Sequence, residues 1–204
     1  MPGGQGDPGD GRRRRNGHSR GLRRLSGIPA LPAGYAIRAA RPDDTRRLIA
    51  VETAAARLFA DHGYPALADE PPRSPREFAR FTAANSVLVA ETADGMPAGF
   101  VVTGDVGGHY YLTELSVDPA HGRRGLGTAL VGAALAAGRG LGYRNAALST
   151  FRAVPFNAPF YRRLGFSDLE PARAEPALRA RFLREVPPGV EASARVLMVR
   201  RIEA

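Results

Sequence analysis

The chain of 204 residues contains no cysteine and no lysine. Without cysteine it can form no disulfide, no zinc–thiolate site and no cysteine nucleophile, so catalytic chemistry must use oxygen, nitrogen or backbone groups. Without lysine there is no P-loop G-x-x-x-x-G-K-[ST] motif, which disfavours a P-loop kinase. No apolar run approaches the roughly 18 residues that a membrane-spanning helix needs, and the N-terminus lacks the apolar core of a secretory signal. We therefore expect a cytoplasmic protein with no membrane association and no metal site.

All 29 basic residues are arginine, and the formal net charge is +9. Much of this charge lies in residues 1–33, a segment rich in Gly, Pro and Arg and poor in aliphatic side chains, so we predict a disordered tail followed by one domain over residues 34–204. The Arg12–Arg15 run is compatible with a nucleic-acid or acidic-partner patch or a targeting peptide. A solvated extension or an over-long start is the simpler interpretation, and we do not expect nucleic-acid binding.

Hydrophobic periodicity and turn residues organise the chain from residue 35 onward. Strands are predicted over 35–40, 86–92, 97–105, 109–117, 145–151 and 194–201, with another after 166. Helices are predicted from 43 to about 62 and over 76–84, 126–138, 157–164 and 177–186. Residues 64–75 carry four prolines and are predicted to be a loop. This order predicts an α/β domain whose mixed, mostly antiparallel sheet has helices on both faces.

Residues 115–127, reading LSVDPAHGRRGLG, run from a strand through Asp-Pro into an arginine-flanked G-x-G and a helix. The two glycines lack a Cβ where backbone must approach a ligand, and the N–H groups from Gly125 to Thr128 lie at the positive end of the helix dipole. Arg123 and Arg124 add positive charge. The segment predicts a pyrophosphate site for a nucleotide-like cofactor, and the alternative is an ordinary glycine-capped turn.

A second motif, NAPFYRRLGF, occupies residues 157–166. Together the two motifs resemble the acyl-coenzyme-A-binding core of the GNAT N-acetyltransferase superfamily, over roughly residues 35–204. The resemblance implies acetyl-CoA as the co-substrate and direct transfer of its acetyl group to a primary amine in a ternary complex. The alternative is a non-catalytic module that binds acyl-CoA or associates with nucleic acid through its basic tail.

The resemblance also implies which residues contact coenzyme A. The pantetheine would run along a splayed strand at Leu115, Ser116 and Val117. The pyrophosphate would be bound by Arg123, Arg124, Gly125, Leu126, Gly127 and Thr128, with a further contact from Asn157. The superfamily pattern usually has Gln or Arg three positions before the first glycine, where this chain has Gly122.

Tyr161 matches the family tyrosine that protonates the departing thiolate. A tyrosine with a pKa near its ordinary value of ~10 is protonated at neutral pH and can donate to sulfur. The alternative is a helix tyrosine half-buried against the sheet. Asn157 can cap the helix that carries Tyr161, contact coenzyme A, or do both.

Glu114 is the leading candidate for the base, directly or through a water. Strand alternation places its side chain on the face opposite Leu115 and Val117. A strand glutamate that only forms a salt bridge or meets solvent is the alternative. Glu52 can help to bind a cationic amine, whereas two nearby histidines match no family base, namely His109 and His121.

The acceptor is predicted to be a small-molecule or peptide amine. Residues 60–75 and 168–193 are expected to wall its pocket, and their composition does not select among a small amine, an amino acid, an antibiotic or a protein N-terminus. The family resemblance also allows a homodimer that forms through terminal strands.

Overall fold

The computed structural model describes residues 31–202, so nearly all of the predicted tail lies outside the described residues. The strands are β1 (Tyr35–Ala39), β2 (Ser86–Thr92), β3 (Pro97–Val106), β4 (His109–Val117), β5 (Asn145–Phe151), β6 (Ser167–Leu169) and β7 (Arg195–Arg201). The α-helices are α1 (Thr45–Ala56), α2 (Pro65–Ala68), α3 (Pro75–Thr82), α4 (Leu126–Gly140), α5 (Ala158–Arg163) and α6 (Pro176–Arg184). None of these helices is both long and apolar enough to cross a membrane.

The seven strands form one sheet in the order β1-β2-β3-β4-β5-β7-β6. The first four make the predicted antiparallel meander, and β7 is antiparallel to both of its neighbours. The single parallel pairing among the described strands joins β4 to β5. The mixed, mostly antiparallel α/β sheet predicted from the sequence is thus confirmed.

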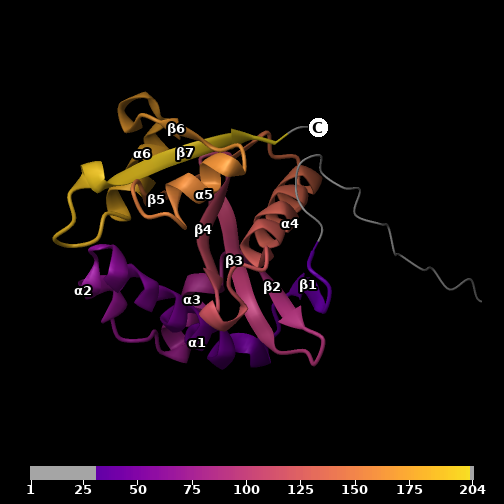
Figure 1. The fold of residues 1–204 in the computed structure, drawn as a ribbon. Helices are drawn as coiled ribbons and strands as arrows, with labels where there is room; N and C mark the ends of the chain where they lie inside the picture. Colours follow the sequence, from indigo (N-terminus) through magenta and orange to yellow (C-terminus); the bar gives the residue numbers. More distant parts are fainter. Residues whose placement is uncertain (1–30, 203–204) are drawn as a thin grey trace, which may run out of the picture.

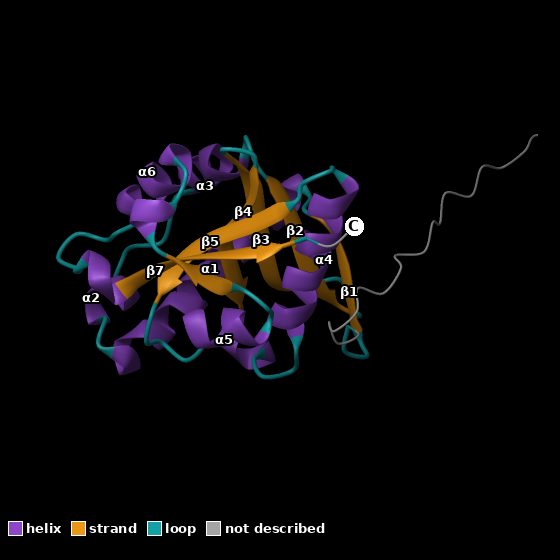
Figure 2. Ribbon diagram, turned by 90° about the horizontal axis from the view of Figure 1, so that it is seen from above, coloured by secondary structure: helices purple, strands orange, loops and turns teal. Residues whose placement is uncertain are grey.

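Helices cover both faces of this sheet (Figure 2). On one face α4 and α5 pack over the largest apolar cluster, in which Leu126, Leu130 and Ala134 are buried as their helical spacing predicted. On the other face α1 and α3 pack against β2 and β3, and α6 packs against β4, β5 and β7. Figure 1 shows α1–α3 together at one end of the molecule and β5, β7, α5 and α6 at the other, with β3 and β4 between them.

The predicted helix from residue 43 to about 62 is a run of three helical pieces. A short 3₁₀ helix (Pro42–Asp44) leads into α1, and a second 3₁₀ helix (Arg57–His62) follows it and ends at Gly63, whose φ is +86°. The region 64–75 differs from prediction because Pro65 stands at the first position of α2, where its fixed φ favours a helical turn.

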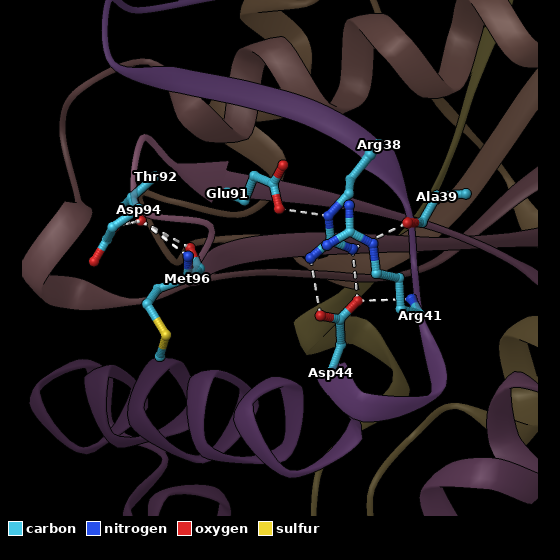
Figure 3. A network of polar contacts seen from close by, with 8 residues as sticks. All are labelled: Arg38, Ala39, Arg41, Asp44, Glu91, Thr92, Asp94 and Met96. Carbon is cyan, nitrogen blue, oxygen red and sulfur yellow. Dashed lines mark hydrogen bonds and ion pairs between the residues drawn. The ribbon is translucent and has the colours of Figure 1, made fainter.

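The edge strand β1 is fixed to the start of α1 by a buried ion network (Figure 3). The guanidinium of Arg38 donates to both carboxylate oxygens of Asp44, at 2.6 and 2.9 Å, and also to Glu91 on β2. Asp44 additionally accepts from the backbone N–H of Arg41. The hydrogen bonds from Arg38 lower the pKa of Asp44, which holds this carboxylate ionised in its buried position.

Candidate active site

The backbone of β4 parts from β5 beyond two residue pairs. Only Tyr110 and Tyr111 pair with β5, opposite Ala146 and Ala147, although both strands continue further. A bulge in β4 at Thr113 lies where they diverge. The segment Leu115–Val117 therefore borders a gap inside the sheet, where its backbone groups on that edge are available to a ligand.

The loop after β4 leads into an open helix N-terminus. Asp118 begins a short 3₁₀ helix by accepting from the backbone N–H of Ala120 at 2.9 Å, and Arg47 on α1 forms an ion pair with Asp118. Gly125, with φ at +85°, then turns the chain into α4 and provides no side-chain cap. The first backbone N–H groups of α4 are consequently left for an anion.

The two predicted arginines of this loop are placed differently. Arg124 donates to the hydroxyl of Tyr35 at 3.2 Å, and that hydroxyl lies 2.8 Å from Nδ1 of His121. Arg123 has a φ of +57° and no ion pair among residues 31–202. A side chain at Gly122 would place its Cβ 3.1 Å from the carbonyl oxygen of Pro119, a tight contact that requires a small shift of the loop.

Helix α5 lies beside the start of α4. Asn157 stands at its N-cap position, but the side chain makes no capping hydrogen bond, so capping does not account for this residue. Phe160 approaches the start of α4, where a Cβ at Gly127 would lie 3.5 Å from its ring. The predicted cofactor residues of both motifs are thus brought together around the gap between β4 and β5.

Tyr161 and Glu114 are the two titratable groups at this gap. Tyr161 is buried, 8% exposed, with its ring against Phe160 and Phe166. Burial, and then the charge of Glu114, raise the pKa of Tyr161 well above its ordinary value, so the hydroxyl stays protonated at neutral pH.

Glu114 lies on the face of β4 opposite Leu115 and Val117, as the alternation predicted. Those two residues pack against the α4 cluster, whereas Glu114 accepts a hydrogen bond from Ser116 Oγ at 2.8 Å. Burial, and then the charge of Glu52 on α1, raise the pKa of Glu114 to about 7. A carboxylate with this pKa can accept and release a proton near neutral pH.

Glu52 lies on the sheet side of α1 rather than on a solvated face. Its side chain is 16% exposed and pairs with Arg73, whose Nε donates to Glu52 Oε1 at 3.1 Å. Burial raises the pKa of Glu52. The two histidines lie elsewhere, because His121 contacts Tyr35 and His109 begins β4, at the end of the strand away from Leu115–Val117.

Sequence reasoning missed a set of residues on the same face as Glu114. Five rings from segments far apart in the chain contact one another, with centroids 4.3 to 6.4 Å apart: Phe59, His62, Tyr64, Phe151 and Phe156. We call this set the aromatic cluster. The guanidinium of Arg195 lies 4.9 Å over the ring of Phe151.

The segments expected to wall an acceptor pocket both reach this face. Tyr64, from the segment 60–75, has its ring 4.3 Å from that of Phe151. Glu185, from the segment 168–193, accepts a hydrogen bond from the hydroxyl of Tyr111 at 2.6 Å. No sequence motif marked these residues. Alternation along β7 does place Arg195 on the same face as Leu197, which is the face that α6 covers.

Comparison with known proteins gives one family and many similar folds. A model described as the acetyltransferase (GNAT) family matches residues 54–166. The Ard1 structure from Thermoplasma volcanium is 17% identical, with a TM-score of 0.59 over 84% of this chain and 99% of that one. The PaiA N-acetyltransferase from Thermoplasma acidophilum, solved with coenzyme A, is also 17% identical, with a TM-score of 0.58 over 82% and 98%.

A third structure is larger than this chain. N-acetylglutamate synthase from Neisseria gonorrhoeae, complexed with coenzyme A and N-acetyl-glutamate, is 20% identical, with a TM-score of 0.63. The match covers 86% of this chain and 37% of the synthase. At these identities the structural matches establish a shared fold.

Proposed function

Because the chain belongs to the acetyltransferase (GNAT) family, we propose that it transfers an acetyl group from acetyl-CoA to a primary amine, by direct transfer in a ternary complex. The observation that carries this proposal is the position of Glu114 and Tyr161 at the gap where β4 parts from β5. This supports the proposal because acetyl transfer needs a group that accepts a proton and a group that donates one near the thioester.

The residues around the gap fit coenzyme A. In the proposed complex the free backbone groups of Leu115–Val117 pair with the pantetheine amides. The pyrophosphate binds the N–H groups from Leu126 to Thr128, with Arg123 and Arg124 supplying positive charge. Asn157, whose side chain is not used as a cap, contacts the same ligand. Acetyl-CoA supplies the thioester that is broken.

Glu114 and Tyr161 divide the proton transfers between them. Glu114, directly or through a water, takes a proton from the acceptor ammonium, so that the neutral nitrogen can attack the acetyl carbonyl. The C–N bond forms, the C–S bond breaks, and Tyr161 Oη donates a proton to the departing sulfur. The second proton, which the nitrogen loses as it becomes an amide, restores the Tyr161 hydroxyl, and Glu114 returns its proton to solvent. The raised pKa of Tyr161 supports this role because the hydroxyl is protonated when the sulfur leaves.

Two measurements on the full chain test the proposal. Calorimetry should show saturable binding of acetyl-CoA, and the ligand should raise the melting temperature because it binds the folded state. A screen of amine acceptors, followed by release of free thiol, should then show transfer. Binding without transfer to any amine would favour a non-catalytic acyl-CoA sensor, and the absence of binding would reject both.

A further inference from the structure

Arg195 is a buried cation with little compensation from the protein. The residue is 9% exposed, and its guanidinium donates twice to a neutral acceptor, Ser149 Oγ, at 2.8 and 3.3 Å. The nearest carboxylate among residues 31–202 is Glu185, at 4.0 Å. Burial lowers the pKa of Arg195 from its ordinary value, so this cation is held where a bound anion would stabilise it.

The other charges on this face are paired with each other. Glu185 forms an ion pair with the guanidinium of Arg181 at 2.6 Å and accepts a hydrogen bond from the hydroxyl of Tyr111 at the same distance. Glu52 takes Arg73. Glu114 is then left without an ion pair among residues 31–202, and Arg195 has only the 4.0 Å contact with Glu185, which is shared with Arg181.

These two groups lie on the same face of the sheet. The printed pairing of β4 with β5 ends at Tyr111 and Ala147. Continuing that count past the bulge at Thr113 points to Ser149 as the residue of β5 nearest to Glu114. The guanidinium of Arg195 is bonded to Ser149 itself. The charge of Glu114 acts on Arg195, which agrees with this placement. A ligand on this face would meet a carboxylate on one side and a guanidinium on the other.

We propose that the acceptor is a small molecule that carries both a primary amine and a carboxylate, such as a free amino acid. Its carboxylate binds Arg195, and its ammonium approaches Glu114. This inference rests on the proposed acetyl transfer and names the class of its acceptor. A peptide N-terminus fits this site less well, because its α-carboxyl group is an amide and leaves the buried guanidinium uncompensated.

The aromatic cluster strengthens this preference. Phe151 lies beneath the guanidinium, and its ring contacts Tyr64 and Phe59 from the helical end of the molecule. These rings limit the access of water to Arg195, and an ion pair in a less polar environment is stronger than one in water. The same rings give an apolar wall beside the position of the amine.

The test compares free amino acids with their α-amides in the wild-type enzyme. Alanine, leucine, phenylalanine and glutamate, each with its α-amide, are supplied with acetyl-CoA, and free thiol is measured. The amine of an α-amide is less basic and therefore more often neutral, so without carboxylate recognition the amides would react faster. We expect kcat/KM for at least one free amino acid to exceed that of its amide by tenfold or more.

Variants assign the preference to Arg195. We expect Arg195→Gln to raise KM for the favoured amino acid at least tenfold and to bring the kcat/KM ratio of amino acid to amide toward one, with an unchanged affinity for acetyl-CoA. Arg195→Lys retains a positive charge and should recover part of the loss. Arg173→Gln, which removes an exposed arginine 81% open to solvent, is the matched control.

The outcomes separate this inference from the function on which it rests. If acetyl-CoA binds and the amides, or amines without a carboxylate such as spermidine and phenethylamine, react as well as the amino acids, the acceptor class proposed here is wrong and the acetyltransferase stands. Binding of acetyl-CoA with no transfer to any of the four amino acids overturns the inference as well. Failure to bind acetyl-CoA rejects the proposed function itself.

Discussion

Replacing Glu114 by glutamine should change activity and stability in opposite directions. Burial and the charge of Glu52 raise the pKa of Glu114 to about 7, although the hydrogen bond from Ser116 opposes the shift. Near pH 7 about half of the folded molecules therefore carry the ionised carboxylate. Glu114→Gln keeps the size and the polarity of this side chain but cannot accept a proton.

For activity, we expect kcat/KM of the wild type to rise with pH around 7 and to level off above it. Loss of a general base typically lowers the rate 10²- to 10⁴-fold, and Glu114→Gln should lose both this factor and the inflection near pH 7. Initial rates of thiol release between pH 5.5 and 9 measure this. Titration of the acceptor amine remains in the variant and can thus be subtracted.

For stability, the sign follows from the raised pKa. The unfolded chain titrates Glu114 near its ordinary value of 4.5 and the folded chain near 7, so between these values the folded state binds more protons. The free energy of unfolding of the wild type therefore falls as pH rises through this window. Glu114→Gln does not undergo this loss. We therefore expect its free energy of unfolding, relative to that of the wild type, to rise by roughly 2 kcal/mol from pH 5 to pH 8.

Urea denaturation at the two pH values gives the stability difference, and Glu170→Gln, an exposed glutamate paired with Arg173, is the control. Three results would refute the reasoning. They are a flat wild-type profile between pH 6 and 8, an inflection near pH 7 that survives in Glu114→Gln, and a variant that is less stable than the wild type at pH 8.

Three further substitutions separate roles at the cofactor site. Tyr161→Phe should lower kcat by at least tenfold with an unchanged acetyl-CoA dissociation constant, because it removes the proton for sulfur and no contact with the cofactor; steady-state kinetics and calorimetry check this. Asn157→Ala should weaken acetyl-CoA binding in calorimetry while its urea midpoint stays at that of the wild type, since no cap is lost. Gly125→Ala should cost about 1–2 kcal/mol in urea denaturation, because φ at this position is +85°.

Local pattern was enough to predict the sheet, and it also supplied the proposed cofactor residues. Strand alternation in 109–117 placed Glu114 opposite Leu115 and Val117, and helical spacing in 126–138 gave the buried face of α4. Both follow from contacts between residues close in sequence. The predicted pyrophosphate loop could be recognised for the same reason, since its glycines and arginines are neighbours in the sequence.

The acceptor side could not be predicted in the same way. Phe59, Tyr64 and Phe151 meet only because the segment between α1 and α2 packs against the end of β5 in the folded chain. The charge of Arg195 points to an anion-binding role only once its burial and the pairing of Glu185 with Arg181 are known. The short helix α2 was missed because a segment with four prolines among its twelve residues, 64–75, is also typical of a loop.

The two residue pairs between β4 and β5 are the whole hydrogen-bonded seam between the meander and the C-terminal strands. Beyond them the halves are held together by side-chain packing: under α4 and α5 on one face, and through α6 and the aromatic cluster on the other. A molecule that lies in the gap and bonds the free edge of β4 acts as an additional strand. The amide protons of 115–117 that point away from β3 should accordingly exchange with deuterium quickly in the free protein and slowly with acetyl-CoA present, so that substrate binding and completion of the sheet are one event.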